Sequence, residues 1–402
     1  MEAKSVILKA GDADRIVAGH PWVYQSSIRE TIGTPADGDV VAVKDHRKRF
    51  IGIGFYNSKS KIAVRVLAHE PVEINGTFFD ARIRQALDVR KRHMPDATSF
   101  RIVNSESDYL SGLIVDKYED VLVIQVSALG MEARKRQIVT VLERIFSPRA
   151  ILERSDISAR KFEGLEPTEG LLAGELTGPV NVNINGLVFE TDLLKGQKTG
   201  LYLDQQINYR LVAELVARLP GATVLDCFSF VGGFALHGAR AGAGHVHMLE
   251  QSADAVNAAM HNAAINRLAE KCSAETVNVF DWLSAQTKIG KHEKLIPKFD
   301  VIVLDPPSFT RNRAAVPNAL RGYKEIHLRA LKLLRPRGML ITFCCSHHVD
   351  AHTFKDTILS AAWDCRKILR QIATFTQGPD HPIIPMIPET EYLKGFAFEL
   401  IS

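Results

Sequence analysis

The stretch VLDCFSFVGGF, residues 224–234, decides the fold of this chain. A run of β-forming residues ends near Asp226, and the adjacent Gly232 and Gly233 stand where the helical pattern FALHGARAG begins. The next strand pattern, HVHMLEQ, carries Glu250 at its end. A strand, a glycine-containing turn, a helix and a second strand make the βαβ unit of a parallel sheet. We therefore predict a doubly wound α/β domain around this stretch.

The alternation of strand and helix continues to the end of the chain. We expect strands at ETVNVF, FDVIVLDPPS and RGMLITFCCS, because near-continuous apolar runs are typical of parallel strands that are covered on both faces. GFAFELI predicts an added antiparallel strand. The predicted doubly wound domain spans residues 190–402.

Two further domains are expected upstream. GDVVAVKD and FIGIGFYN are bounded by Gly, Asp and Asn, and they predict a small β-barrel-like domain over residues 1–72. Residues 73–189 combine a helix, whose apolar residues recur every four positions from Phe79, with the strands GLIVDKY and VLVIQV. A second helix is expected from Glu132, and the Asn-Gly pair inside VNVNINGLVFETD predicts a hairpin with a type I′ turn. The middle region is therefore expected to be an α+β domain.

The composition is that of a globular protein of two or three domains. The chain has 402 residues, of which 46% are hydrophobic and 24% charged. Its start lacks the apolar stretch of a signal peptide, and no run is apolar enough to span a bilayer, so we expect a cytoplasmic protein without membrane contact. The five cysteines include no C-x-x-C pair, which disfavours a disulfide framework and a zinc site. We therefore expect no metal.

Basic residues gather in three parts of the chain. They occur in DHRKRF, in ARIRQALDVRKRH and after residue 310, within a chain of net charge +4. A solvated face explains any single cluster, whereas three clusters together favour a polyanionic partner such as RNA. The candidate RNA-binding residues are Arg47, Lys48, Arg49, Arg311 and Arg313.

Ligands of an open α/β sheet bind beyond the carboxyl ends of its strands, which selects the residues at the predicted strand ends. The adjacent glycines let backbone approach a ligand closely, and Glu250 can hold both ribose hydroxyls of a nucleotide. The pattern is not G-x-G-x-x-G, and Asp226 suits a cationic amino-acid moiety better than a pyrophosphate. These residues favour S-adenosylmethionine over NAD, although a glycine-rich turn that only packs would have the same sequence pattern.

The stretch DPPS, which begins at Asp305, is the sharper motif. Its two prolines fix the backbone at the end of VIVL and aim an acid and a carbonyl into the expected cleft. Such a loop suits a flat base with a polar edge. A rigid strand exit without function is the alternative, and the position of Asp305 at the ligand-binding end weighs against it.

VLDCFSFVGGF, LDPPSF and CCSHH, in this order, resemble the motifs of S-adenosylmethionine-dependent RNA methyltransferases. GHPWVYQSSI, ESDYLSGLIVDKY, ERSD and GQKTGLYLDQQINYR narrow the resemblance to bacterial 23S ribosomal RNA 5-methylcytosine methyltransferases. The resemblance covers nearly the whole chain and implies a PUA domain, a central domain and a Rossmann-like catalytic domain. The cofactor-binding residues that it implies are Lys198, Thr199, Gly200, Asp226, Phe228, Gly232, Glu250, Asn278, Val279 and Asp305.

The same resemblance gives two adjacent cysteines different roles. It implies that Cys345, which precedes a serine, attacks C6 of cytosine, and that Asp305 supplies a proton or hydrogen bond at N3. Neighbouring residues on a strand point to opposite faces. We therefore expect Cys344 to pack under a helix as a small hydrophobe.

Two positions depart from the family that the chain resembles. Many members carry a second cysteine in the Asp-Pro loop that assists product release, whereas Pro307 and Ser308 stand here. Asn278 stands where relatives often carry Asp. Its carbonyl can still accept from the adenine amino group, and Asp281 is a rival for that contact.

The expected function is C5 methylation of a cytosine in 23S ribosomal RNA through a covalent adduct between Cys345 and C6. Methylation of a guanine or adenine nitrogen is the nearest rival, since related DPP loops serve that chemistry without a cysteine. An RNA-binding assembly factor without activity is a second rival, against which the intact Cys345, Asp305 and Glu250 argue. A nicotinamide dehydrogenase lacks the expected glycine fingerprint.

Several properties stay open at this point. They include the target nucleotide, the choice between naked RNA and a large-subunit precursor, and the oligomeric state, with a homodimer among the options. The base that removes the C5 proton and the roles of His347 and His348 are also open.

Overall fold

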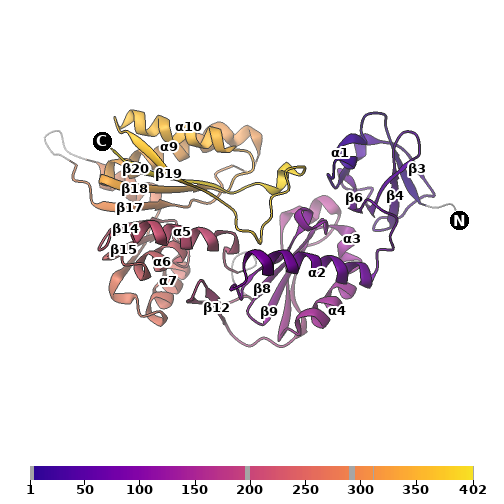
Figure 1. Ribbon diagram of the computed structural model, residues 1–402, viewed down its shortest axis with the longest axis horizontal. Coiled ribbons are helices and arrows are strands. Elements are labelled where there is room, and N and C mark those ends of the chain that lie inside the picture. Colours follow the sequence, from indigo (N-terminus) through magenta and orange to yellow (C-terminus); the bar gives the residue numbers. More distant parts are fainter. Residues whose placement is uncertain (1–3, 195–199, 289–294, 311, 402) are drawn as a thin grey trace. The chain divides into compact units, whose positions relative to one another are not determined.

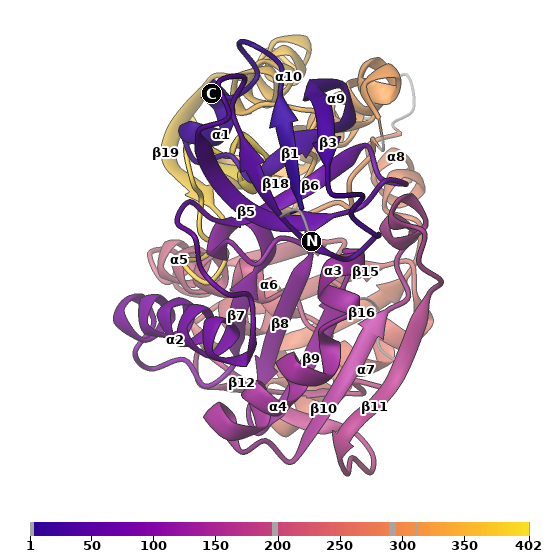
Figure 2. The same cartoon turned by 90° about the vertical axis from the view of Figure 1, so that its right-hand side faces the viewer.

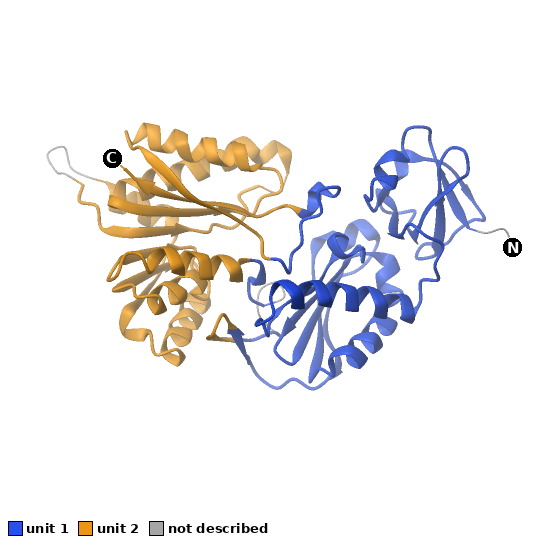
Figure 3. Cartoon of the chain, viewed as in Figure 1, with its two compact units in different colours: residues 1–183, 191–204, 379–390 blue, residues 184–190, 205–378, 391–402 orange. Residues whose placement is uncertain are grey.

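The computed structural model describes residues 4–194, 200–288, 295–310 and 312–401. The chain forms two compact units, which Figure 3 colours separately. Unit 1 comprises residues 1–183, 191–204 and 379–390, and unit 2 comprises residues 184–190, 205–378 and 391–402. The division into domains at residues 1–72, 73–189 and 190–402 stays a prediction.

Unit 1 begins with a six-stranded sheet in the order β2-β6-β5-β4-β1-β3. Its strands are β1 (Ser5–Leu8), β2 (Trp22–Tyr24), β3 (Ile28–Ile32), β4 (Val40–Lys44), β5 (Phe50–Tyr56) and β6 (Ile62–Ala68). Val41 and Val43 of β4 are buried and their neighbours less so, which is the period of two of a strand with one covered face. They pack in one core with Val64 and with Ile16 of the short helix α1 (Asp14–Val17). The predicted β-rich N-terminal fold is confirmed.

The second sheet of unit 1 has five strands in the order β11-β10-β9-β8-β7, which can be followed in Figure 2. They are β7 (Phe100–Asn104), β8 (Leu113–Tyr118), β9 (Val121–Val126), β10 (Ala150–Ser155) and β11 (Thr168–Gly174). The helices are α2 (Gly76–His93), α3 (Leu129–Glu132) and α4 (Lys135–Phe146), and α2 contacts α4 and β7. The helix expected from Glu132 begins instead at Lys135, because Arg134, with φ −113° and ψ 8°, interrupts the helical conformation.

The hairpin predicted at VNVNINGLVFETD is present as β12 (Val180–Ile184) and β13 (Leu187–Thr191). At its turn Asn185 has φ 52° and Gly186 has φ 83°. A type I′ turn requires a positive φ at both central residues, and Asn and Gly tolerate it best. The boundary between the two units falls within this hairpin.

Unit 2 is built on a seven-stranded sheet in the order β16-β15-β14-β17-β18-β20-β19. Its strands are β14 (Thr223–Cys227), β15 (His245–Glu250), β16 (Cys272–Thr276), β17 (Phe299–Leu304), β18 (Leu334–Cys344), β19 (Leu369–Thr376) and β20 (Lys394–Leu400). Strands β14 to β18 pair in parallel, whereas β20 is antiparallel to both β18 and β19. The predicted Rossmann-like sheet and its added antiparallel strand are confirmed.

Helices cover both faces of this sheet. They are α5 (Gln206–Val216), α6 (Gly233–Arg240), α7 (Ala253–Ile265), α8 (Val279–Thr287), α9 (Val316–Leu333) and α10 (Ala351–Asp364). Figure 1 shows α9 and α10 on one face and α5, α6 and α7 on the other. Leu331 of α9, Ile358 of α10 and Leu340 of β18 belong to one buried core. Two covered faces explain why β14, β17 and β18, at the centre of the sheet, consist mostly of buried residues.

One prediction for unit 2 is wrong, and one strand of unit 2 is missing from the predictions. The sequence predicts a strand over ETVNVF, but β16 ends at Thr276, and Val279 and Phe280 begin helix α8. The side-chain oxygen of Asn278 caps that helix by accepting from the backbone N–H groups of Phe280 and Asp281. The edge strand β19 was also not expected, because most of its residues are exposed and its polarity pattern is mixed.

Candidate active site

The carboxyl ends of the parallel strands of unit 2 lie at one edge of the sheet. Cys227 at the end of β14 pairs with Leu249 of β15 and with Leu304 of β17. Strand order reverses beside β14, and an open α/β sheet binds ligands at such a point. The predicted site residues brought to this edge are Asp226, Phe228, Gly232, Glu250, Asn278, Val279, Asp305 and Cys345.

The turn after β14 has an unusual backbone. Phe228, Phe230 and Gly232 have φ values of 64°, 47° and 89°. Such values are rare for bulky residues, and backbone strain of this kind clusters at ligand-binding sites. A Cβ on Gly233 would lie 2.4 Å from the ring of Tyr209, so glycine is needed there for close packing.

Glu250 fixes the position of this turn. Its Oε2 accepts a hydrogen bond of 3.0 Å from the backbone N–H of Phe230, across from β14. Its Oε1 accepts from the N–H groups of Gln251 (2.7 Å) and Ser252 (2.9 Å). The carboxylate is therefore pre-oriented, and each oxygen still has capacity to accept from a ligand hydroxyl.

Asp226 is a buried carboxyl whose pKa is strongly raised. Its Oδ2 accepts from the N–H of Ala235 at 3.0 Å, whereas its Oδ1 is buried without a hydrogen-bond partner. Burial raises the pKa of this carboxyl well above its usual range, and the negative charges of Asp305 and Glu250 raise it further. Three acidic groups are thus crowded at one strand edge, where a cation would stabilise all of them.

This arrangement fits the predicted cofactor. S-adenosylmethionine carries a sulfonium and an ammonium group, and either cation would satisfy the unpartnered oxygen of Asp226. The hydroxyl of Ser229 is also buried without a hydrogen-bond partner, so it could bind a polar group of the ligand. Asp305 is held by the side chain of Gln205, whose Nε2 donates to Oδ1 at 3.1 Å. Gln205 and Ser229 were missed from the sequence, although both lie inside motifs quoted above.

Aromatic rings line the same edge. Phe280 lies 6.3 Å from Phe228 and 5.5 Å from Phe309, measured between ring centroids. All three rings are only partly buried. A half-exposed aromatic cluster suits the flat face of an adenine or of a target base. Phe309 directly follows the DPPS stretch, and its position there was the signal available in the sequence.

The two adjacent cysteines have different surroundings. Cys344 is fully buried, and its thiol donates to the hydroxyl of Tyr323 on α9 at 3.3 Å. Burial raises the pKa of the Cys344 thiol, which keeps it protonated. Cys345 is only half-buried, and its sulfur lies 3.9 Å from the carbonyl oxygen of Pro306 in the DPPS loop. The prediction that Cys344 packs under a helix is confirmed.

Four predicted residues have no described position relative to this edge. Lys198, Thr199 and Arg311 lie outside the described residues. Gly200 belongs to unit 1, where it has φ 135° and an added Cβ would lie 3.1 Å from the ring of Tyr118. Its expected contact with the cofactor stays a prediction.

The predicted RNA-binding residues occupy exposed turns. Arg47, Lys48 and Arg49 form the turn between β4 and β5, and the carboxylate of Asp45 accepts from the N–H groups of Arg47 and Arg49. Arg313 is exposed just before α9. Arg90, part of the second basic cluster, is instead fully buried. The basic pattern therefore overestimates the charged surface of α2.

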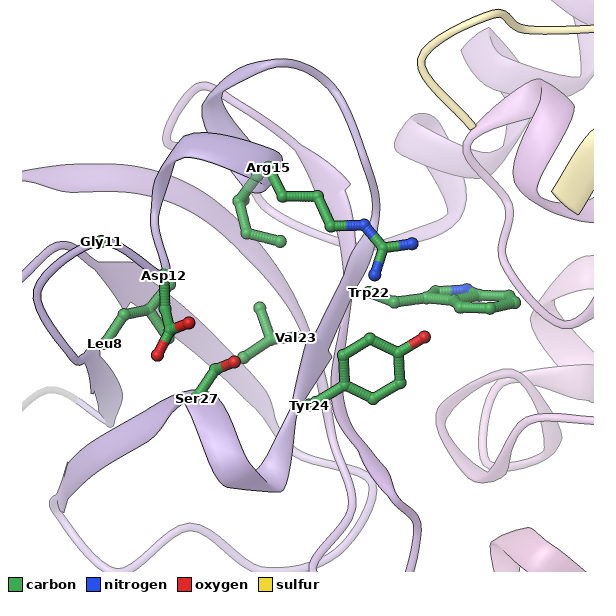
Figure 4. Close-up of a pocket in the computed structure, with 9 residues that line it drawn as sticks. Leu8, Gly11, Asp12, Arg15, Trp22, Val23, Tyr24 and Ser27 are labelled. Carbon is green, nitrogen blue, oxygen red and sulfur yellow. The ribbon is translucent and has the colours of Figure 1, made fainter. Parts of the chain in front are cut away.

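A small hollow lies in the N-terminal sheet of unit 1 (Figure 4). It encloses about 250 Å³ between α1 and β2. The guanidinium of Arg15 lies 5.5 Å from the ring centroid of Tyr24, and Trp22 stands beside that ring at a centroid distance of 6.5 Å. Leu8 and Val23 add apolar lining, and Asp12 and Ser27 add polar groups. One flat, polar-edged group of the size of a nucleobase suits this lining.

Clusters of metal-ligating side chains and membrane-spanning helices are both absent from the described parts of the chain. No group of three or more His, Cys, Asp or Glu side chains there could hold a metal ion. None of the helices described is both long enough and apolar enough to cross a bilayer.

Comparisons with known proteins add to this geometry. Residues 6–69 match the PUA-like domain family, and residues 157–381 match the S-adenosylmethionine-dependent methyltransferase family. The chain is 38% identical to ribosomal RNA large subunit methyltransferase I of Pseudoalteromonas translucida over 97% of this chain and 98% of that protein. It is 39% identical to the protein of the same name from Shewanella amazonensis, over 96% and 97%. A candidate methyltransferase solved in complex with SAH has the same fold, with a TM-score of 0.82, 19% identity, and coverage of 98% and 99%.

Proposed function

Because the chain belongs to the S-adenosylmethionine-dependent methyltransferase family, among the ribosomal RNA large subunit methyltransferase I proteins, we propose that it methylates C5 of a cytosine in 23S ribosomal RNA. The half-buried thiol of Cys345 beside the DPPS loop carries the proposal. A nitrogen methyltransferase needs no nucleophile there, because ring and exocyclic nitrogens already carry the lone pair that accepts a methyl group.

The cofactor is S-adenosylmethionine, which supplies an electrophilic methyl group. Glu250 is proposed to accept from the ribose hydroxyls, and Asp226 to hold the positive charge of the amino-acid moiety. Phe228, together with Val279 and Asn278 at the start of α8, would border the adenine. Lys198, Thr199 and Gly200 remain proposed cofactor contacts.

Covalent catalysis overcomes the weak nucleophilicity of C5. The Cys345 thiolate forms an S–C6 bond, and the electron pair of the C5–C6 double bond moves to make C5 carbanion-like. When the base binds, Asp305 takes up a proton and donates a hydrogen bond to N3, which stabilises this adduct. C5 then accepts the methyl group, its hydrogen leaves as a proton to a base or to water, and the S–C6 bond breaks to return the thiolate.

The RNA is proposed to be held by the N-terminal sheet of unit 1 and by exposed basic turns. Arg47, Lys48 and Arg49 protrude from the β4–β5 turn and would contact phosphates, as would Arg311 and Arg313 in unit 2. The aromatic hollow shown in Figure 4 would take one unpaired base. Removal of residues 1–72 should then weaken RNA binding, and RNA affinity should fall as salt rises.

The adjacent cysteines supply a matched test of the proposed chemistry. Cys345→Ala should lower methyl transfer to ribosomal RNA by at least about a thousand-fold, with S-adenosylmethionine binding retained in calorimetry. Cys344→Ala should keep turnover and lose about 1 kcal/mol of stability as a small buried group. RNA with 5-fluorocytosine at the target should trap an adduct on Cys345, because fluorine cannot leave as a proton.

Two outcomes would contradict the proposed function. An active Cys345→Ala enzyme, or an adduct mapped to Cys344, would remove the nucleophile from the mechanism. Mass spectrometry of the nucleosides gives the second check, since a methyl group on a guanine or adenine nitrogen would favour the rival chemistry.

A further inference from the structure

Lys394 occupies an unusual position for a lysine. It is the first residue of β20, pairs with Cys344 across the sheet, and is only 8% exposed. Its ammonium donates to the carbonyl oxygens of Ser346 at 2.6 Å and of Val349 at 2.7 Å. A charged group is therefore buried against backbone carbonyls of a single loop.

Burial of this ammonium is costly. Desolvation lowers the pKa of Lys394, although the nearby thiols of Cys344 and Cys345 and the carboxylates of Glu391 and Asp350 act in the opposite direction. A strand end that only needed packing would be satisfied by an apolar residue, because an apolar side chain has no such penalty. The groups that Lys394 contacts should therefore explain why a charged side chain is buried at this position.

The loop that Lys394 contacts starts at the proposed nucleophile. Cys345 directly precedes Ser346, and its sulfur lies against the carbonyl of Pro306 on the other side. The ring of His347 in the same loop lies 5.5 Å from that of Tyr392, two residues before Lys394. The start of β20 thus holds the loop by a ring contact and by two charge-assisted hydrogen bonds.

We propose that Lys394 is a positioning residue for Cys345: it fixes the loop that presents the thiol and supplies a positive charge that favours the thiolate. The inference deepens the proposed function and rests on it for the role of Cys345 as nucleophile. Lys394 itself touches neither base nor cofactor in this proposal. The thiolate is the attacking form of cysteine, and a neighbouring cation increases its population.

Other ionisable groups also surround this loop. They are Asp305 after β17, Tyr323 on α9, His347 and His348 within the loop, Asp350 just before α10, and Glu391 before β20. The acidic members disfavour a thiolate. A cation that opposes them is therefore needed if Cys345 is to react near neutral pH.

The rate at which iodoacetamide alkylates Cys345, followed against pH by peptide mass spectrometry, tests the inference. Lys394→Met should raise the apparent pKa of the reaction by about one unit, which lowers the rate at neutral pH about tenfold. Lys394→Gln keeps a hydrogen-bond donor without the charge and should show most of the loss. Lys394→Arg keeps the charge and should restore most of the rate. The Cys345→Ala variant measures how much iodoacetamide reacts with Cys344 alone.

A second lysine of unit 2 provides the control. Lys355 on α10 lies over the ring of Phe396 at 5.2 Å, and Lys355→Met removes one positive charge without changing the loop. Its alkylation profile should match that of the unaltered chain. In turnover, Lys394→Met should lower kcat and leave the KM for S-adenosylmethionine nearly unchanged.

Two results would overturn the role of Lys394. One is an unchanged pH profile of alkylation in folded Lys394→Met or Lys394→Gln protein that binds S-adenosylmethionine normally. The other is failure of both neutral variants to fold, which would assign the lysine to the fold. Alkylation needs neither RNA nor methyl transfer, so the result is independent of the Cys345→Ala activity test that decides the proposed function.

Discussion

Glu163 in unit 1 and Asp226 in unit 2 are both almost fully buried acids, yet the charges of the groups around them have opposite signs. Burial raises the pKa of each, but at Glu163 the charge of Arg65 and three hydrogen-bonded side chains outweigh it and lower the pKa overall. At Asp226 the neighbouring charges are Asp305 and Glu250, and the pKa is raised well above its usual range.

We propose that the difference separates a buried charge that serves stability from one that serves ligand binding. The guanidinium of Arg65 donates to Glu163 at 2.9 Å, so this carboxylate has its charge partner within unit 1. The Oδ1 of Asp226 has no hydrogen-bond partner, so the strand edge of unit 2 is complete only with a ligand. Substitutions in the first place should therefore change stability, and substitutions in the second should change affinity.

The largest effect is expected in unit 1. Arg65→Met leaves the buried carboxylate of Glu163 without its charge partner, which should lower the free energy of unfolding by about 3–5 kcal/mol. Denaturant titration measures the loss, and Arg84→Met is the control, because Arg84 forms an exposed i,i+4 pair with Asp80. The control should lose about 0.5 kcal/mol or less. A loss in Arg65→Met no larger than that of the control would show that the pair is not needed for stability.

A smaller effect is expected in the core of unit 2, which buries His327 as a neutral ring. Its Nδ1 donates to the carbonyl of Tyr323, so its Nε2 accepts from the hydroxyl of Thr342 at 2.8 Å. Burial lowers the pKa of His327 to about 4. Because the folded pKa is depressed, the stability that it contributes is present above the unfolded value of about 6.5 and is lost as pH falls towards 4, by about 3 kcal/mol at most.

Unfolding curves between pH 7 and 4 check this expectation. His327→Gln should flatten the acid dependence, whereas His352→Gln should not, because His352 is exposed on α10. An acid dependence that is the same in the unaltered chain and in His327→Gln would place the titrating group elsewhere.

Asp226→Asn should weaken cofactor binding without lowering the stability of the free protein. The amide can keep the hydrogen bond from Ala235 and removes a crowded charge, so the free protein should be as stable or more stable. S-adenosylmethionine should bind more weakly by about 1.5–3 kcal/mol, the range for a hydrogen bond to a charged group. Calorimetry and thermal unfolding on the same samples measure both.

The pH dependence of this comparison has a definite sign. A carboxyl with a raised folded pKa contributes stability below its unfolded value of about 3.9, and the contribution is lost as pH rises through the folded pKa. The stability gained by Asp226→Asn should therefore grow as pH rises from about 4. Asp300→Asn is the control, because Asp300 accepts from Thr223 and Arg335 at the other end of the sheet. It should lose stability and keep cofactor affinity, and weaker binding by this control would contradict the assignment.

The sequence predicts the sheet of unit 2 and the residues at its carboxyl edge because both depend on local pattern. Apolar runs ending in Asp226, Glu250, Asp305 and Cys345 identify strands and their carboxyl ends without any knowledge of distant contacts. The partners of those residues depend on packing. Gln205, which holds Asp305, lies 100 positions away in the chain.

Long-range pairing explains what could not be predicted. Arg90 looks like one more surface cation of a basic helix, but it donates to Asp108 and to the carbonyl of Asp380, 290 positions further on. Lys394 looks like an ordinary strand-start lysine, and only its contacts with Ser346 and Val349 show that it is buried. No periodic pattern records such contacts.

Asn278 gives the smallest and most diagnostic effect, because sequence and structure assign its oxygen different partners. The sequence suggests an adenine contact, whereas the structure has the side chain capping α8 through the N–H groups of Phe280 and Asp281. Asn278→Ala should lose about 1 kcal/mol of stability as a lost helix cap. Asn278→Asp should keep the cap, since Asp is an equally good N-cap residue.

Calorimetry with S-adenosylmethionine then separates the two roles. If Asn278 only caps the helix, Asn278→Asp should bind the cofactor as the unaltered chain does, and Asn278→Ala should bind slightly more weakly because the start of α8 frays. If the oxygen also accepts from adenine, Asn278→Ala should lose about 1 kcal/mol of binding beyond its loss of stability. Asp281→Ala is the matched variant for the rival contact, since Asp281 is exposed in the first turn of the same helix. Weaker binding by Asp281→Ala together with unchanged binding by Asn278→Ala would move the adenine contact to Asp281 and leave Asn278 on the structural side of the comparison.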